Sequence, residues 1–283
     1  MVRMNRSCFQ MPVPAALAVL LALPLGAIAQ VRLPPPAQNE GSGFTWALGA
    51  SLINGPRYAG SAERSMGVRP VIGVEIGRFT LSTGGGGSLL DFDLDARDSG
   101  VSARLFQWEN FRLSAGLRLD GGRKGEDDPV LSGLPDVRRT VRGRLGAVYD
   151  FNDQFSVRTT LSQDLLGHQG GATLQTTALY EYQISPLTEI TLAAGFTLAN
   201  ATYMRSYFSV PQQAASPLPR YEAGGGIHGT DLGIEVKTLL TDRWVLLGGV
   251  RYQQLRGDAR RSPLAVKPDN YSVSIGLAYR CCR

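Results

Sequence analysis

Apolar and polar residues alternate along most of the chain that follows residue 43. The clearest stretch has apolar side chains at Phe111, Leu113, Ala115, Leu117 and Leu119, each followed by a polar residue or glycine: Arg112, Ser114, Gly116, Arg118 and Asp120. The same alternation runs through residues 141–151 and 271–279. Successive side chains of a strand point to opposite faces, so a period of two predicts β-strands with one apolar and one polar face.

Connection lengths decide what kind of sheet these strands form, because a soluble sandwich or a lipocalin-like barrel also alternates. The pattern predicts twelve strands, at residues 44–53, 67–76, 78–83, 100–108, 111–119, 140–151, 155–163, 171–184, 188–198, 230–240, 244–255 and 271–280. The longer connections are 54–66, 84–99, 120–139, 164–170, 199–229 and 256–270. They alternate strictly with five tight turns.

Tight turns on one side and long loops on the other are typical of bacterial outer-membrane barrels. We therefore predict an all-β fold, a transmembrane antiparallel up-and-down β-barrel of about 12 strands. Both chain ends then lie on the tight-turn side, which faces the periplasm. Residues 84–99 leave one alternative open, because Leu90, Phe92 and Leu94 alternate there with aspartates, and an extra hairpin gives 14 strands.

Aromatic residues support this topology, because membrane barrels carry aromatic belts at the two interfaces. All three tryptophans fall beside the predicted tight turns or chain ends. The full set on that side is Phe44, Trp46, Phe79, Trp108, Phe111, Phe151, Phe155, Tyr182, Trp244 and Tyr279.

The N-terminus is typical of an export signal. Arg3 and Arg6 precede an apolar run at residues 13–25, and Ala27-Ile28-Ala29 follows with small residues at its first and third positions. A membrane anchor is the alternative, but the run is short and interrupted by prolines. The predicted domains are a cleavable signal peptide at 1–29, a periplasmic Pro-rich segment at 30–43 and the barrel at 44–283. Such a protein is located in the outer membrane of a Gram-negative cell.

Composition narrows the function classes. Without the signal, 29 − 2 = 27 basic residues stand against 24 acidic ones, a net charge of +3, so we expect no nucleic-acid partner. No later apolar run reaches the roughly 20 residues of a membrane helix.

Cys281 and Cys282 are adjacent, and neighbours satisfy disulfide geometry poorly, so unpaired thiols or a link to another molecule are favoured over an internal disulfide.

Charged residues recur on the polar face of the predicted strands. A charge facing lipid costs roughly 2 to 4 kcal/mol at the bilayer midplane, so these side chains are expected to point into the lumen. They are Arg69, Glu75, Arg104, Arg112, Arg118, Arg142, Arg144, Arg158, Glu181, Glu235, Lys237 and Arg251. Twelve strands lie between filled eight-stranded barrels and open porins, so two readings stay open: a plugged interior with paired charges, or a narrow anion-favouring pore.

Little in the chain suggests catalysis, and we predict no enzyme, no metal and no cofactor. The mature chain has two histidines, His168 and His228, without metal-ligand spacing. The glycine run at residues 84–87 lacks the ending of a phosphate loop. Ser162 and Asp164 precede His168 near the rim, where a barrel hydrolase places its nucleophile and base, but three such residues are common in polar loops.

Four loop motifs give the chain a resemblance to a known family. They are Arg57-Tyr58-Ala59-Gly60-Ser61, Gln163-Asp164-Leu165-Leu166-Gly167-His168-Gln169-Gly170, Tyr203-Met204-Arg205-Ser206-Tyr207-Phe208-Ser209-Val210 and Gly257-Asp258-Ala259-Arg260-Arg261-Ser262-Pro263. In this order the motifs resemble the MipA/OmpV family of outer-membrane proteins over nearly all of the mature chain. The family pattern has glycine where this chain has Ser209, and its barrels usually end on an aromatic residue, whereas Arg280-Cys281-Cys282-Arg283 follows Tyr279.

The resemblance implies a scaffold that joins a murein-degrading lytic transglycosylase to a bifunctional peptidoglycan synthase. Other members resemble surface adhesins or small-solute channels, so these functions are the alternatives. Outer-membrane lipid is expected to surround the outer face of the barrel. For a scaffold, the segment at 30–43 is the expected docking region, with the short tail after Tyr279 as a minor contact.

Overall fold

The computed structural model describes residues 44–83 and 100–281. The predictions for the signal peptide, the Pro-rich segment and the alternating run at 84–99 fall outside these residues.

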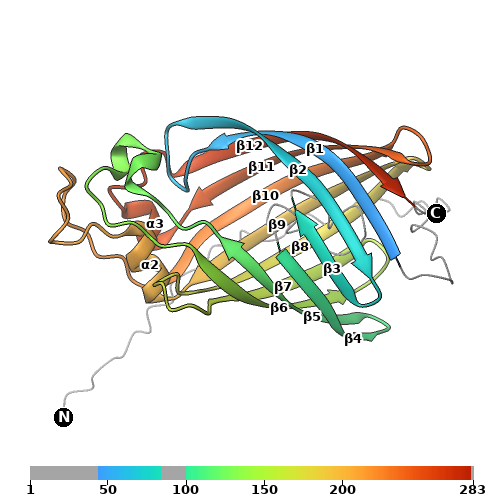
Figure 1. Cartoon of the computed structure of the whole chain (residues 1–283), viewed down its shortest axis with the longest axis horizontal. Coiled ribbons are helices and arrows are strands. Elements are labelled where there is room, and N and C mark those ends of the chain that lie inside the picture. Colours follow the sequence, from blue (N-terminus) through green and yellow to red (C-terminus); the bar gives the residue numbers. More distant parts are fainter. Residues whose placement is uncertain (1–43, 84–99, 282–283) are drawn as a thin grey trace, which may run out of the picture. The chain divides into compact units, whose positions relative to one another are not determined.

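Twelve antiparallel strands close into a barrel (Figure 1). Each strand pairs with its neighbours in the chain, and β1 pairs with β12. The strands are β1 (Phe44–Pro56), β2 (Arg64–Ile76), β3 (Phe79–Thr83), β4 (Gly100–Trp108), β5 (Phe111–Asp120), β6 (Thr140–Asp150), β7 (Phe155–Asp164), β8 (Ala172–Ser185), β9 (Thr188–Ala199), β10 (Gly226–Leu239), β11 (Trp244–Leu255) and β12 (Asp269–Cys281). The predicted fold is confirmed.

Strand number and strand ends can now be compared with the prediction. β3 pairs directly with β4, so no further hairpin lies between them in the barrel wall, and the alternative of 14 strands is wrong. The largest boundary difference is at β10, which begins at Gly226 and pairs with the end of β9. The predicted connection ran from 199 to 229, but pairing with β9 holds its last residues in the extended strand.

The two faces of the wall differ as alternation predicts. Leu48 and many other large apolar side chains are exposed on the outward face. The neighbouring Ala47 is buried and belongs to a cluster with Val71 of β2 and Leu239 of β10. Val245 of β11 and Ala278 of β12 complete this cluster, so it runs along the inward face of five consecutive strands.

Aromatic rings gather beside the tight turns. The Trp46 and Tyr279 ring centroids are 5.9 Å apart, and Trp244 lies 5.3 Å from Tyr279. Phe151 and Phe155 flank another tight turn with their centroids 5.3 Å apart. Rings at this height suit the membrane interface, because their apolar bodies face lipid while polar tips reach the headgroups.

The long connections contain short helices that the sequence pattern did not predict: η1 (Gly125–Asp127), η2 (Pro129–Leu131), α2 (Ala201–Phe208) and α3 (Gly257–Arg261). The side chain of Asn200 caps α2 by accepting a hydrogen bond from the Tyr203 backbone at 2.9 Å. Among the described residues, no helix is long and apolar enough to cross a membrane.

The expectation about the C-terminal cysteines was wrong in one respect. Cys281 is disulfide-bonded, so the expectation of an unpaired thiol does not hold for this residue.

Candidate functional site: the loop cap

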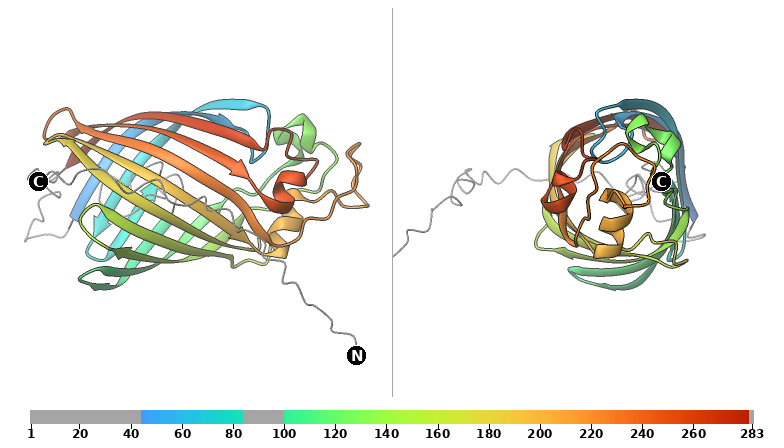
Figure 2. Two further views of the ribbon diagram at one scale, coloured as in Figure 1. Left: turned by 180° about the vertical axis from the view of Figure 1, so that it is seen from behind. Right: turned by 90° about the vertical axis from the view of Figure 1, so that its left-hand side faces the viewer.

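Five long connections come together at the end of the barrel opposite the tight turns. We call residues 57–63, 121–139, 165–171, 200–225 and 256–268 the loop cap. Seen end-on, α2 lies within the outline of the barrel and neighbouring loops reach across the mouth (Figure 2). In outer-membrane barrels the long loops are external, so the cap lies at the outer mouth.

The loop cap has an apolar core of its own. One cluster of buried side chains combines α2, α3 and the ends of two strands, namely Ala199, Met204, Phe208, Ala223, Leu255 and Ala259. A second cluster joins Leu131, Leu134, Val210 and Leu264 from three different loops. Tyr221 packs against both clusters. Loops with buried apolar residues are held in one arrangement, so the cap is a packed layer.

The first family motif docks on the fourth. The Tyr58 hydroxyl donates to the carbonyl oxygen of Leu264 at 2.9 Å. Gly60 has a φ of 101°, and a Cβ there would lie 2.8 Å from the Cα of Ala265. The Gly60 carbonyl also accepts a hydrogen bond from the Lys267 backbone at 2.9 Å. Glycine is therefore required at this position both by its conformation and by the close approach.

The second motif is held by two charged side chains of the barrel wall. The Asp164 carboxylate accepts from the backbone of Gly170 at 2.9 Å and from the hydroxyl of Thr140. Arg142 pairs with Asp120 at 2.5 Å and donates to the Gly170 carbonyl at 2.7 Å. Because Arg142 is buried, these bonds satisfy its charge where water is excluded.

Two further residues of this motif have defined places. Gly167 has a φ of 67°, which favours glycine. His168 is partly buried, and its Nδ1 lies 2.6 Å from the carbonyl oxygen of Arg139.

The third motif is helix α2. Tyr203 stacks on Tyr207 at 4.5 Å and on His228 at 5.4 Å. Met204 and Phe208 point into the apolar core of the cap. This motif therefore supplies packing surface on one face of the helix.

The fourth motif ties α3 to the loop after α2. Ser262 is buried, and its hydroxyl donates to the Phe208 carbonyl at 2.6 Å. The Asp258 carboxylate accepts from the backbone of Gly224 at 2.7 Å. Gly257 begins α3 with a φ of 52°. Pro263 lies between Ser262 and the buried Leu264.

Ser209, which departs from the family pattern, has a role in this structure. Its hydroxyl accepts a hydrogen bond from the Ala223 backbone at 2.8 Å, and both groups are buried. Its φ of −94° is accessible to any residue. The serine therefore adds a contact that glycine cannot make.

Burial in the loop cap shifts tyrosine ionisation. Desolvation, together with the nearby negative charge of Asp128, raises the pKa of Tyr58 to about 12. Desolvation likewise raises the pKa of Tyr203. Both phenols therefore remain neutral hydrogen-bonding groups at ordinary pH.

Strand register places all twelve predicted lumen charges on the inward face. The inward face is identified by the buried side chains of Ala47 and Val71, and strand register extends the assignment to the other strands. The charges are Arg69, Glu75, Arg104, Arg112, Arg118, Arg142, Arg144, Arg158, Glu181, Glu235, Lys237 and Arg251.

Further inward charges were missed by sequence reasoning. They are Asp120, Asp150, Asp164, Glu189, Asp231 and Arg280. Asp120 and Asp164 lie one residue beyond the predicted strand ends, whereas the other four lie inside predicted strands and were left out of the predicted lumen charges. The twelve predicted charges comprise nine basic and three acidic residues, so with these the count becomes ten basic against eight acidic. The lumen wall is less basic than expected.

Several of these charges pair with each other. Arg112 lies 3.0 Å from Asp150, Arg104 lies 2.9 Å from Glu75, and Lys237 lies 3.1 Å from Glu189. Such pairs lower the cost of charges inside the barrel.

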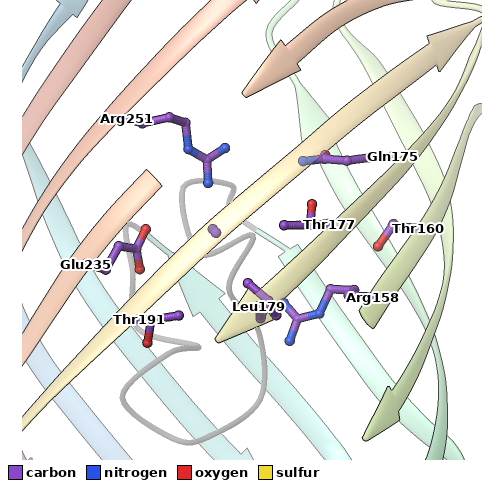
Figure 3. Close-up of a pocket in the computed structure, with 9 residues that line it drawn as sticks. Arg158, Thr160, Gln175, Thr177, Leu179, Thr191, Glu235 and Arg251 are labelled. Carbon is purple, nitrogen blue, oxygen red and sulfur yellow. The ribbon is translucent and has the colours of Figure 1, made fainter. Parts of the chain in front are cut away.

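The inward face encloses a small cavity between β7 and β11 (Figure 3). Its volume is about 20 Å³. The lining residues are Arg158, Thr160, Gln175, Thr177, Leu179, Thr191, Ala193, Glu235 and Arg251. Seven of these nine residues carry polar side chains, so the cavity is a polar part of the lumen.

The candidate catalytic residues do not form a catalytic arrangement in the described part of the chain. The Asp164 carboxylate is occupied by the turn that it closes. The Ser162 hydroxyl is buried and has no hydrogen-bond partner, while His168 contacts the Arg139 carbonyl. A nucleophile requires a base within hydrogen-bond reach, and no such bond joins these two side chains. The described residues also contain no group of three or more His, Cys, Asp or Glu side chains that could hold a metal ion.

A closed antiparallel barrel with an apolar outer wall, a charged interior, an aromatic belt and a loop-covered mouth defines an outer-membrane β-barrel protein. The chain belongs to the MipA family, described as MltA-interacting protein MipA, whose model matches residues 48–281. The predicted family is therefore confirmed.

Two relatives with known names are outer-membrane proteins. Omp26La of Vibrio anguillarum is 24% identical over 66% of this chain and 73% of its own length. OmpV of Vibrio cholerae serotype O1 is 25% identical over 68% of this chain and 77% of its own. Family, relatives and fold together place the protein in the outer membrane, as predicted.

Solved structures with a similar outline include the NanC porin and OmpT of Vibrio cholerae. The NanC porin has a TM-score of 0.41 at 8% identity, covering 84% of this chain and all of that chain (100%). In-vitro folded OmpT has a TM-score of 0.39 at 10% identity, covering 84% of this chain and 96% of its own. Likenesses this low say nothing about function.

Proposed function

We propose that this protein is an outer-membrane scaffold for enzymes that remodel peptidoglycan, a lytic transglycosylase and a peptidoglycan synthase. The observation that carries the proposal is the loop cap, in which all four family motifs are used to hold loops over the outer mouth. A packed layer of loops over the mouth obstructs the passage of solutes, which is unfavourable for a wide pore. It does not interfere with a protein that serves as a membrane anchor for partners. The family description, an MltA-interacting protein, supports a partner of the murein-degrading class.

The docking surface of such a scaffold must lie on the periplasmic side, where the barrel offers little protein. Tight turns such as residues 151–154 and 240–243 join the strands there. Specific interfaces bury about 800 Å² per partner, more than turns of this size supply. The segment at 30–43 contains Pro34, Pro35 and Pro36, which favour an extended polyproline conformation. An extended segment loses less conformational entropy on binding than a flexible one, so we propose residues 30–43 as the main contact.

Capture experiments test both parts of this proposal. The immobilised intact protein is compared with a variant that lacks residues 31–42, and each is offered the purified transglycosylase or synthase. A matched control lacks residues 211–220 of the loop cap, which removes a similar length from the other end. We expect the intact protein and the control to capture the enzymes and the 31–42 deletion to lose capture.

The outcomes separate the two claims. Undiminished capture by the 31–42 deletion rules out the docking segment but leaves the scaffold. Absence of capture by the intact protein rules out the scaffold itself. Heat-modifiable migration on gels checks that each variant has folded as a barrel.

A second candidate function is a narrow channel that favours anions. The observation in its favour is the polar cavity on the lumen wall, lined by two arginines and one glutamate. Planar-bilayer recordings test it, because a scaffold need not conduct and a channel must. Anion preference in the reversal potential supports the channel, and cation preference contradicts it.

A further inference from the structure

Two cross-strand pairs of aromatic residues mark two heights on the outward face of β11 and β12. Trp244 faces Tyr279 beside the tight turns. Eight residues further along both strands, Tyr252 faces Tyr271, and both rings are exposed. Eight residues of antiparallel strand span about 27 Å, and a strand tilt of about 40° reduces this to a height of roughly 20 Å. Because the apolar band of a membrane barrel is about 25 Å tall, the Tyr252 and Tyr271 rings lie at the outer membrane interface.

Arg64 lies at the same height, with its side chain on the outward face. Its guanidinium carbon is 4.1 Å from the centroid of the Tyr271 ring, a cation–π contact. The Arg64 Nη1 donates to the Tyr271 carbonyl oxygen at 3.1 Å. Nε and Nη2 donate to the Asn54 side-chain oxygen at 2.8 Å and 2.5 Å, and Nη2 also lies 3.4 Å from the Asn54 carbonyl oxygen. All of these acceptors are neutral, so they fix the position of the guanidinium and leave its charge uncompensated.

Arg256 adds a second positive charge on the far side of Tyr252. Its Nε donates to the Thr230 hydroxyl at 3.2 Å, and that acceptor is also neutral. Thr230 is the outward position next to Leu232, the register partner of Tyr252, so Arg256 lies just above the outer aromatic pair. Within the described residues only the Nε atom of Arg256 is used by a side-chain contact, which leaves both terminal nitrogens available to a ligand.

The outward face around these arginines has a net positive charge. Strands β10, β11, β12, β1 and β2 follow one another in the barrel wall (Figure 1). Over residues 226–239, 244–255, 269–281, 44–56 and 64–76, Asp269 is the one acidic residue on the outward face. Arg260 pairs with Asp269 at 3.2 Å, while the exposed Glu63 before β2 forms no ion pair with Arg64. The charges of Arg64 and Arg256 therefore remain, a net charge of +2.

We propose that this outward face binds a phosphorylated glycolipid of the outer leaflet, of the lipid A class. The Arg256 guanidinium presents two parallel N–H groups, the geometry that binds a phosphate group. Arg64 adds a second positive charge, held in place by Tyr271 and Asn54. Positive side chains at a membrane surface are stabilised by anionic headgroups.

The surface below the two arginines fits the rest of such a lipid. Large apolar side chains are exposed there and form a wall for acyl chains, namely Leu52, Met66, Val68, Val250, Val273 and Ile275. A free phosphate ion would use the arginines alone, whereas a lipid uses both parts of this surface. The site lies on the outside of the barrel, so it is independent of the scaffold and of the channel proposed above.

Native mass spectrometry of the full-length folded barrel in detergent measures lipid binding. The probes are lipid A with both phosphates and the same lipid after removal of its phosphates, and inorganic phosphate is the competitor. We expect the intact protein to bind the phosphorylated lipid at least about tenfold more tightly, the typical effect of charge-assisted hydrogen bonds. Inorganic phosphate at the concentration of the lipid should not displace it. Equal affinity for the two lipids, or displacement by inorganic phosphate, overturns the proposal.

Substitutions locate the site. The double variant R64Q/R256Q removes both charges and should weaken binding of the phosphorylated lipid by at least about tenfold. The matched control is R243Q, because the Arg243 Nη1 donates to the Tyr279 hydroxyl at 2.9 Å beside the tight turns, at the opposite membrane interface. R243Q should leave the affinity within about twofold. The proposal is wrong if the double variant binds as tightly as the intact protein, or if the control loses as much affinity as the double variant. Heat-modifiable migration on gels checks that each variant is a folded barrel.

Discussion

At the scale of single residues, the polar side chains of the loop cap serve backbone groups. The Ser262 hydroxyl and the Tyr58 phenol each bond to a main-chain atom of another connection, and the Ser209 hydroxyl bonds to the Ala223 backbone within its own connection. Loop backbone that is buried away from water must find such partners, because an unpaired carbonyl or amide costs free energy. Short polar residues therefore set the positions of these loops.

Replacement of Ser262 tests this role. Ser262→Ala leaves the buried Phe208 carbonyl without its 2.6 Å donor, and an unsatisfied buried acceptor costs about 1 to 3 kcal/mol. We expect faster amide hydrogen exchange in α2. The matched control is Ser206→Ala, which removes an exposed bond to the Gln169 carbonyl and should change exchange much less. Equal exchange in the two variants would contradict the assignment.

The phenol of Tyr58 makes the loop cap sensitive to alkaline pH. Its folded pKa is raised to about 12 from the ordinary 10 by burial and by Asp128. Between these values the unfolded phenol loses its proton while the folded one keeps it, so the folded cap loses stability as pH rises. The stabilisation that the neutral Tyr58 phenol gives to the folded state is fully present below pH 10 and is lost as the pH rises through about 12.

Alkaline absorbance titration of the intact protein and of Tyr58→Phe measures this directly. The difference curve should show one phenol with a midpoint near 12. A difference curve centred at 10 would mean that Tyr58 is not held neutral by its surroundings.

At the scale of elements, strands were predictable from the sequence and the cap was not. Alternation is a local signal, so β5 and β12 were located within two residues at either end. The contact between Tyr58 and Leu264 joins residues 206 positions apart, and no local pattern contains it. Helix α2 was missed because eight residues offer little helical periodicity, and its Asn200 cap is equally typical of a turn.

The lumen charges show the same difference between local features, which the sequence predicts, and contacts between distant residues, which it does not. The sequence pattern assigned mid-strand charges to the inward face because apolar residues mark the opposite face, but it left out Asp231 in the middle of β10. It also left Asp120 and Asp150 out of the lumen charges, so it did not identify the partners of Arg142 and Arg112. The motifs identified which loops matter, but their arrangement depends on contacts between loops.

Gly171 fixes the position of α2 relative to the barrel wall. It has a φ of 60°, and a Cβ there would lie 2.3 Å from the Tyr203 nitrogen. Gly171→Ala therefore combines backbone strain with a clash against the helix. Gly77→Ala is the matched control, because Gly77 has a φ of 58° with nothing within 4 Å of an added Cβ.

We expect Gly77→Ala to cost about 1 to 2 kcal/mol, the strain alone. Gly171→Ala should cost more and displace α2. Urea unfolding compares the free energies, and limited proteolysis of residues 200–225 reports the displacement. Equal costs with equal proteolysis would show that α2 does not pack closely against Gly171.

At the scale of the whole molecule, the proposed functions use opposite ends of the barrel. The loop cap closes over the outer mouth, and the proposed docking segment precedes β1, which starts at the end with the tight turns. A change confined to the cap should therefore alter permeation and leave partner binding intact. This separation makes the two ends independently testable.

The decisive variant replaces residues 211–220 with two glycines, because the bridge between Val210 and Tyr221 already brings the ends of this segment together. The replacement removes Ala214 and Leu218, which pack on the second apolar cluster of the cap. We expect single-channel conductance above that of the intact protein, with transglycosylase capture unchanged. Loss of capture would place the partner on the outer face. Unchanged conductance would show that the barrier to ions lies deeper than this segment, so that opening the mouth alone does not make a channel.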